Sequence, residues 1–194
     1  RSTLNSQPST LNQLTGWWTS VAAGDFDGDG KMDLAAGNWG RNSMYELYRP
    51  GPWRIYYGDW NGDGIVELIE AWPKGGRWLP GRDRLWLARG LPELLNRFSS
   101  HEVFGQASVQ DILGGNAPGA KWAEVTELDS GVFLNRGSRF EWVPLPRAAQ
   151  LSPAFSVNTG DCDGDGLEDL FLSQNFFGSA ADLSRVSRSA PCNL

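Results

Sequence analysis

The chain has 194 residues, 23 acidic and 17 basic side chains, and a formal net charge of −6. No apolar segment approaches the ~20 residues of a membrane-spanning helix, and no basic stripe indicates a nucleic-acid surface. We therefore expect neither a membrane span nor a nucleic-acid partner. The 24 glycines, 11 prolines and 10 tryptophans are typical of a turn-rich β protein with large aromatic side chains between its strands.

Both ends of the chain are polar and lack hydrophobic periodicity. The letters STLN occur at 2–5 and again at 9–12, among serine, glutamine and asparagine residues. We predict an N-terminal tail over 1–14 and a C-terminal tail over 179–194, with the folded part between them at 15–178.

The first acidic cluster of the chain is DFDGDGKMD, residues 25–33. Its carboxylates repel one another, so the cluster needs a positive counter-charge. Acids at positions 1, 3, 5 and 9, with a carbonyl at position 7, can face one hard cation, and oxygen ligands at this spacing are typical of calcium. Gly28 and Gly30 fit a loop with strained backbone. The predicted ligands are Asp25, Asp27, Asp29, Asp33 and the carbonyl of Lys31.

The same pattern occurs again in DWNGDGIVE, residues 59–67, and in DCDGDGLED, residues 161–169. Three copies in one chain argue against a chance acidic turn, and eleven of the 23 acids lie at these positions, so the acidity is local. We predict about three bound calcium ions. The further predicted ligands are Asp59, Asn61, Asp63, Ile65 and Glu67 in the second copy, and Asp161, Asp163, Asp165, Leu167 and Asp169 in the third.

Position 12 distinguishes these loops from the helix–loop–helix calcium hand, which needs a bidentate Glu there. The three copies carry Ala36, Glu70 and Leu172 at this position, so only the second satisfies the hand pattern. Short runs of β-branched, aromatic and small residues lie on both sides of each loop. The pattern therefore predicts strand, ion loop, strand.

The spacing of the copies predicts how the strands are grouped. The first two loops start 34 residues apart, which is enough for one compact blade. The third starts 102 residues after the second, and the interval contains helical patterns such as GLPELLNRF and SVQDILGG. We predict first-blade strands around 21–26, 33–39, 43–49 and 53–60, a helical insertion at about 88–116, and later strands at about 121–128, 131–135 and 139–144.

These residues resemble the FG-GAP or VCBS repeats of integrin-α-like β-propellers, in which a calcium loop joins two strands of each blade. GNWG at 37–40 and QNFFG at 174–178 lie where that family has its Phe-Gly signature, without the Gly-Ala-Pro half. Residues 132–153 are similar to the bacterial subgroup associated with the ASPIC/UnbV domain. The resemblance covers about residues 16–178.

The resemblance implies a mostly β fold: a partial or open β-propeller of about three four-stranded blades, with calcium loops and a short helical insertion. A closed propeller usually has about four to eight blades. We therefore expect the chain to be a fragment of a larger propeller, or its open edges to be covered by another chain. The implied role is a calcium-stabilised scaffold for adhesion or protein interaction.

Carbohydrate binding is the alternative function. Ten tryptophans, with pairs such as Trp17–Trp18 that look exposed, motivate a calcium-dependent lectin-like module or the non-catalytic part of a larger polysaccharide-acting enzyme. Aromatic residues beside strands more often pack between blades. The expected partner is therefore a protein or glycan ligand whose identity the sequence leaves open.

We expect no enzyme activity, because the single histidine, His101, lies in the predicted helical insertion and no catalytic set can be assembled around it. Low-affinity calcium loops fill at the about 10⁻³ M calcium found outside cells, so we expect an extracytoplasmic location. Cys162 lies at loop position 2, where a small packed hydrophobe is expected, and its pairing with Cys192 stays open.

Overall fold

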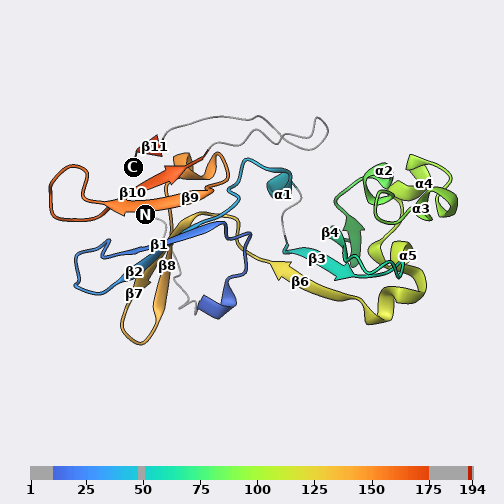
Figure 1. The fold of residues 1–194 in the computed structure, drawn as a ribbon, viewed down its shortest axis with the longest axis horizontal. Helices are drawn as coiled ribbons and strands as arrows, with labels where there is room; N and C mark the ends of the chain where they lie inside the picture. The colour runs from blue at the N-terminus through green and yellow to red at the C-terminus, as the bar shows by residue number, and fades with distance from the viewer. Residues whose placement is uncertain (1–10, 48–50, 175–191, 194) are drawn as a thin grey trace. The chain divides into compact units, whose positions relative to one another are not determined.

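The computed structural model describes residues 11–47, 51–174 and 192–193. The chain divides into two compact units (Figure 1). The interrupted unit consists of Arg1–Leu47 and Glu127–Leu194, and the inserted unit is Tyr48–Thr126. Among the described residues, no helix has the length and apolar character that crossing a membrane requires.

The interrupted unit contains a four-stranded antiparallel sheet with the strand order β1-β2-β7-β8. Leu34 of β2 pairs with Phe133 of β7, so residues on either side of the inserted unit are direct neighbours. A 3₁₀ helix, η1 (Leu11–Gln13), precedes the sheet, and the helix α1 (Met44–Leu47) follows β2. The strands are β1 (Ser20–Gly24), β2 (Asp33–Gly37), β7 (Gly131–Asn135) and β8 (Phe140–Pro144).

A second sheet of the interrupted unit pairs β9 (Ser156–Gly160) with β10 (Asp169–Ser173), and the short β11 (Cys192–Asn193) lies beside β10. The 3₁₀ helix η3 (Arg147–Gln150) precedes β9. Strand β9 contacts β1 and β2, so the two sheets pack together through mostly small side chains. The buried core is Ala35, Val132, Ala149, Ala154, Val157 and Leu172.

The inserted unit is built on another antiparallel sheet, with the strand order β5-β4-β3-β6. Gly75 and Gly76, with φ of 56° and 76°, connect β4 to β5 in a two-residue turn of the kind that favours glycine. Five short helical segments lie between β5 and β6: α2 (Arg84–Leu87), α3 (Leu94–Arg97), α4 (His101–Gly105), α5 (Val109–Leu113) and η2 (Gly114–Gly119). The strands are β3 (Trp53–Gly58), β4 (Glu67–Lys74), β5 (Arg77–Pro80) and β6 (Lys121–Val125).

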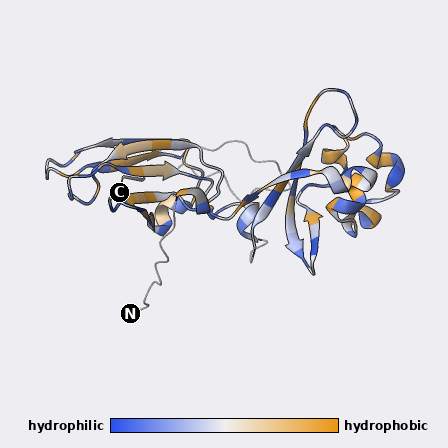
Figure 2. Cartoon of the chain, turned by 90° about the horizontal axis from the view of Figure 1, so that it is seen from below, coloured by the Kyte–Doolittle hydropathy of each residue, from blue (hydrophilic) through white to orange (hydrophobic). Residues whose placement is uncertain are grey.

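The inserted unit has a hydrophobic core of its own, formed where the helices cover the sheet. Helices α2, α4 and α5 begin at N-cap side chains, from Asp83, Ser100 and Ser108, that accept a backbone hydrogen bond in the first turn. The helices carry hydrophobic and hydrophilic residues side by side (Figure 2), as expected when one face of each packs inward. The largest fully buried side chains of this unit include Trp53, Ile69, Leu94 and Ile112.

Several expectations from the sequence are confirmed. All three loops connect paired antiparallel strands. Helices α3, α4 and α5 lie within the predicted helical insertion at about 88–116, while α2 precedes it, and strands β6, β7 and β8 follow within a few residues of their predicted bounds. The fold is mostly β with three antiparallel sheets, and no closed propeller is present among the described residues. Most of the predicted tails at 1–14 and 179–194 and most of QNFFG lie outside the described residues. The described parts of the tails are structured, because 11–13 form η1 and 192–193 form β11.

The predicted strand at 43–49 is wrong, because residues 44–47 form the helix α1. Met, Glu and Leu are strong helix formers, and Tyr45 is buried with its ring stacked on Trp17 at a centroid distance of 4.2 Å. The prediction that the first two loops belong to one blade is also wrong. Strand β2 pairs with β7, whereas β3 belongs to the sheet of the inserted unit.

The structure also places the single side chains about which the sequence raised expectations. Trp17 and Trp18 look exposed in the sequence but are half-buried, since Trp17 stacks on Tyr45 and Trp18 packs edge-on against Phe133 and Trp142, in agreement with the packing role expected of aromatic residues beside strands. Cys162 is exposed and carries a free thiol, so it is not a packed hydrophobe.

Candidate metal sites

The three acidic loops have the same position in their sheets. Loop 1 (residues 25–33) joins β1 to β2, loop 2 (59–67) joins β3 to β4, and loop 3 (161–169) joins β9 to β10. In each, the glycine before the first acid is paired across the hairpin with the acid at position 9. Glycines at positions 4 and 6 have φ between 71° and 89° in every loop, a conformation that costs glycine little.

Backbone hydrogen bonds repeat at the same positions of the loops. The N–H at position 6 donates to the Asp at position 1, with N···O distances of 2.8, 3.0 and 3.1 Å in loops 1, 2 and 3. The N–H at position 7 donates to the Asp at position 5, and the N–H at position 2 donates to the acid at position 9. These bonds hold each loop in a tight turn with its carboxylates gathered on one side.

The structure brings three carboxylates together in each loop. Their oxygens lie within 4.8 Å of one another, in the groups Asp25–Asp27–Asp29, Asp59–Asp63–Glu67 and Asp161–Asp163–Asp169. Oxygens about 2.4 Å from one calcium ion are at most about 4.8 Å apart, so the spacing and the all-oxygen donor set fit this ion. Calcium bound there would neutralise carboxylates that otherwise repel one another.

The other predicted ligands lie elsewhere in the loops. Asp33 is buried and accepts the N–H groups of Phe26 and Asn135, at 3.0 and 2.6 Å, and Asp165 accepts the N–H of Leu167. Asn61 accepts the N–H of Asp63 and donates to the carbonyl of Gly90. The predicted carbonyl ligands at position 7 are Lys31, Ile65 and Leu167. The backbone N–H of each donates to the Asp at position 5 of its loop, and the role of its carbonyl as a ligand stays a prediction.

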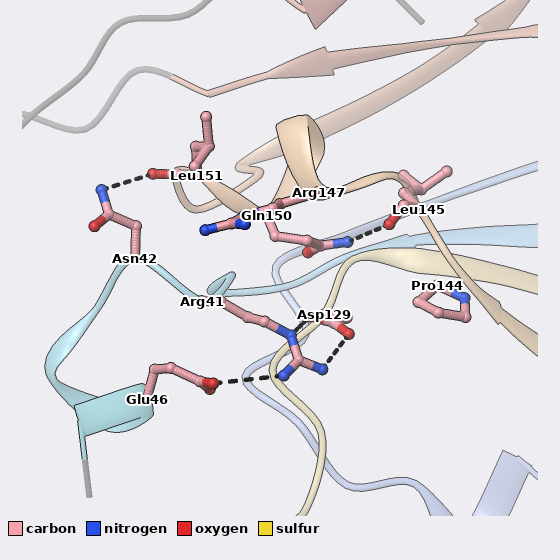
Figure 3. A pocket seen from close by; sticks show the side chains of 9 residues that line it. All are labelled: Arg41, Asn42, Glu46, Asp129, Pro144, Leu145, Arg147, Gln150 and Leu151. Atoms are coloured by element: carbon pink, nitrogen blue, oxygen red, sulfur yellow. Dashed lines mark hydrogen bonds and ion pairs between the residues drawn. The ribbon is translucent and has the colours of Figure 1, made fainter. Parts of the chain in front are cut away.

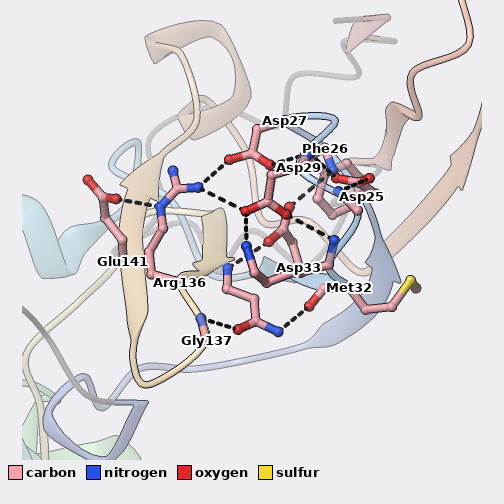
Figure 4. A network of polar contacts seen from close by, with 12 residues as sticks. Asp25, Phe26, Asp27, Asp29, Met32, Asp33, Arg136, Gly137 and Glu141 are labelled. Carbon is pink, nitrogen blue, oxygen red and sulfur yellow. Dashed lines mark hydrogen bonds and ion pairs between the residues drawn. The ribbon is translucent and has the colours of Figure 1, made fainter.

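Two cationic side chains lie beside the acids of loop 1, and Figure 4 shows one of them, Arg136. The Lys31 ammonium lies 2.6 Å from Asp29, and this hydrogen bond lowers the pKa of the Asp29 carboxyl. Arg136, in the turn between β7 and β8, forms ion pairs with Asp27 and Asp29. It also pairs with Glu141 at 2.9 Å, and Glu141 and Asp27 together raise the pKa of the Arg136 guanidinium.

Loop 2 borders a cavity of about 460 Å³ in the inserted unit. The acids Asp63 and Glu67 line it, together with the segment between α2 and α3, which includes the cation Arg89. Exposed apolar side chains line the rest, including Ile65, Leu68 and Trp86. A cavity of this size with an apolar lining and a few polar groups is typical of ligand sites.

The interrupted unit has another cavity, of about 550 Å³, beside η3 (Figure 3). Three of the charged groups that line it are paired, because the Arg41 guanidinium donates to both carboxylate oxygens of the buried Asp129 and lies 3.5 Å from Glu46. The side chain of Gln150 donates to the carbonyls of Ser130 and Leu145 and accepts the N–H of Ser130. This network joins the segment after β2 to those around β7 and β8, so we interpret it as structural.

Sequence reasoning missed the residues that other segments bring to the loops. Arg136 is 109 residues from Asp27, and Trp86 lies on a helix that the sequence did not connect with loop 2. Glu168 was also missed: its Oε2 atom is buried and lies against Gly24, so loops 1 and 3 are neighbours. No local pattern indicates these contacts.

Comparison with protein families identifies one repeat. The family model of the FG-GAP repeat matches residues 17–42, which contain β1, loop 1 and β2. The chain therefore contains an FG-GAP repeat at these residues, with acidic clusters that could hold calcium. The searches of curated proteins and of solved structures gave no match. The relation to the ASPIC/UnbV subgroup and to a larger propeller stays a prediction.

Proposed function

We propose that this chain is a non-catalytic calcium-binding repeat module that serves as a scaffold for adhesion or protein interaction outside the cytoplasm. The observation that carries the proposal is the threefold occurrence of one hairpin loop with its carboxylate oxygens within 4.8 Å of one another. The FG-GAP repeat at 17–42 supports it, because this match covers loop 1 with its two strands.

In this proposal, bound calcium stabilises the folded state of the chain. Without an ion, each loop holds three carboxylates in close proximity, and their repulsion opposes the folded hairpin. An ion that binds only the folded state stabilises it by mass action, more strongly as calcium rises above the dissociation constant. Loops of low affinity fill at about 10⁻³ M calcium, which supports the extracytoplasmic location.

Calcium titration tests the proposal. After chelation of bound metal, calorimetry should detect about three ions per chain, and the melting temperature should rise with calcium concentration. Magnesium at the same concentration is the control, because it demands a stricter octahedral geometry and should bind less well. Absence of both calcium-dependent heat and thermal stabilisation would refute the proposal.

A calcium-dependent carbohydrate-binding module is the second candidate. The cavity beside loop 2 favours it, because exposed Trp86 and the acids Asp63 and Glu67 line the same space. A sugar can bind an ion through its hydroxyls and stack its apolar face on an indole ring. A protein-interaction scaffold requires neither a hydroxyl-binding ion nor an exposed indole ring in a cavity. Binding to a glycan array that requires calcium and is lost in Trp86→Ala would decide for this candidate.

A further inference from the structure

The three loops differ in the charges that surround them. In loop 1, Lys31 lies 2.6 Å from Asp29, and Arg136 forms ion pairs with Asp27 and, at 3.7 Å, with Asp29. Within the part of the chain that the structure describes, no ion pair involves an acid of loop 2 or loop 3. Loop 1 alone therefore has neighbouring side chains that already neutralise its carboxylates.

Arg136 is held in this position from its other side. Its Nε donates to Glu141 of β8 at 2.9 Å, and its Nη1 reaches loop 1, so the guanidinium bridges the two (Figure 4). The preceding residue, Asn135, donates its backbone N–H to Asp33 and its side-chain amide to the carbonyl of Met32. The turn between β7 and β8 is thus attached to loop 1 by both charged and neutral hydrogen bonds.

Loop 1 also differs from loops 2 and 3 in the surroundings of its acid at position 9. Glu67 and Asp169 belong to the groups of close carboxylates in loops 2 and 3, whereas the group in loop 1 lacks Asp33. Both Asp33 oxygens accept backbone N–H groups, one of them from Asn135. Each loop therefore gathers three carboxylates, but loop 1 does so without its acid at position 9, because backbone N–H groups occupy both oxygens of that acid.

We propose that Arg136 is the built-in counter-ion of loop 1 and competes with calcium for Asp27. This inference rests on the proposed calcium binding of the three loops. A carboxylate oxygen of Asp27 that coordinates calcium has to leave the guanidinium, and a positive charge that stays close repels the dication. Loop 1 consequently fills at a higher calcium concentration than loops 2 and 3, and its filling releases Arg136 from the loop.

The release has a structural consequence within the interrupted unit. Arg136 keeps Glu141 as a partner, while the link between loop 1 and the turn after β7 is reduced to the hydrogen bonds of Asn135. High calcium therefore loosens the charged contact between the hairpin of β1 and β2 and the hairpin of β7 and β8. Calcium at loops 2 and 3 has no comparable contact to displace among the described residues.

The test follows the calcium occupancy of each loop separately, in the full chain. Each loop has a glycine at position 6, Gly30, Gly64 or Gly166, whose N–H donates to the first Asp, so its amide NMR signal reports an ion at that Asp. We expect the Gly30 signal of the wild type to shift at higher calcium than those of Gly64 and Gly166. Arg136→Gln should lower the midpoint for Gly30 by about tenfold and leave the other two unchanged.

Arg139→Gln is the matched control, because it removes one positive charge from the same turn at a side chain that makes no ion pair with loop 1. All three midpoints should stay at their wild-type values. The proposal is overturned if Gly30 responds at the same calcium concentration as Gly64, or if Arg136→Gln leaves the Gly30 midpoint unchanged. If the variant does not fold, the order of the calcium midpoints of Gly30, Gly64 and Gly166 in the wild type tests the proposal by itself. If no glycine responds, the proposed function fails and this inference fails with it.

Discussion

Acids at the same position of the repeat have different roles because their neighbours differ. Asp33, Glu67 and Asp169 all accept the N–H of the residue at position 2. The second oxygen of Asp33 accepts the N–H of Asn135, whereas each of the other two acids has an oxygen within 4.8 Å of oxygens from two other carboxylates of its loop. Residue type and spacing therefore identify a candidate ligand, and the hydrogen bonds around it decide whether its oxygens are available.

Loop 2 permits a sharp test at the residue scale, because it has acids at positions 9 and 12. Glu67 joins the carboxylate group of the loop, while Glu70 lies further along β4 and pairs with Arg82 at 2.7 Å. Glu67→Gln should weaken calcium binding at this loop by about tenfold, since a neutral amide replaces a charged ligand. Calcium titration followed at Gly64 measures the effect.

Glu70→Gln is the control for this prediction. It removes the same charge from the same strand and costs the ion pair with Arg82, so it should leave the calcium midpoint unchanged and lower stability slightly. A large loss of affinity in Glu70→Gln with Glu67→Gln nearly silent would mean that the loop binds calcium as a helical hand does.

Local sequence features, such as turn glycines and helix caps, account for most of the individual strands and helices. Glycine pairs and acid loops form the hairpins, and hydroxyl or carboxylate side chains begin the helices. The clearest example is α5, where Ser108 and Asp111 form a reciprocal capping box and Arg77 pairs with Asp111 at 2.8 Å. Helix α1 is the exception, because burial of Tyr45 and good helix formers override the strand expected there.

Removal of the α5 cap should destabilise the inserted unit. Ser108→Ala should lower the free energy of unfolding by about 1 kcal/mol, because it removes the acceptor for the Asp111 N–H and a donor to its carboxylate. Hydrogen bonds from Ser108, and then Arg77, lower the pKa of Asp111. A lowered pKa stabilises the fold at neutral pH, and this contribution is lost as the pH falls through that pKa.

The pH dependence distinguishes this effect from a general loss of packing. The difference between Ser108→Ala and the wild type should be largest at neutral pH and should shrink below the ordinary Asp pKa of 3.8. Urea unfolding at several pH values measures it. Ser99→Ala, at an exposed position outside the helices, is the matched control and should have little effect. An equal loss at every pH would contradict the assigned role of Asp111.

At the scale of the whole molecule, one unit is inserted into another. The sheet β1-β2-β7-β8 is formed by segments before and after the insertion. Buried Asn38 joins these segments, because it donates hydrogen bonds to the Ser130 hydroxyl and to the carbonyls of Glu127 and Asp129. The inserted unit has its own sheet, helices and core. An insertion whose core is self-contained is expected to fold without its host.

Residues 51–126 alone should therefore fold and bind one calcium ion at loop 2. Circular dichroism should record a cooperative thermal transition whose midpoint rises with calcium. Leu94→Ala in the same fragment is the control: this fully buried side chain lies in the core, and its truncation should cost about 2–5 kcal/mol and abolish or strongly lower the transition. A fragment that melts without cooperativity in millimolar calcium would contradict independent folding.

Features that depend on residues close together in the chain are predictable from the sequence alone. Carboxylates at alternate positions, glycines at positions 4 and 6 and strand-forming flanks predict three hairpin loops, because the bonds that shape each loop connect residues within one nine-residue segment. The helical region of the inserted unit follows in the same way from its hydrophobic spacing and its N-caps.

The sequence does not predict which strands share a sheet or which distant side chains contact each loop. These features are visible only in the three-dimensional structure. Asn135 and Arg136 contact loop 1 across 102 and 109 residues of chain, and no periodicity in either segment indicates the other. Strand β7 pairs with β2 although the whole inserted unit lies between them in the sequence. Strand pairing depends on which strand edges lie next to each other in the fold, and local sequence does not specify this. The three loops therefore look equivalent in sequence, while the fold surrounds each with different charges.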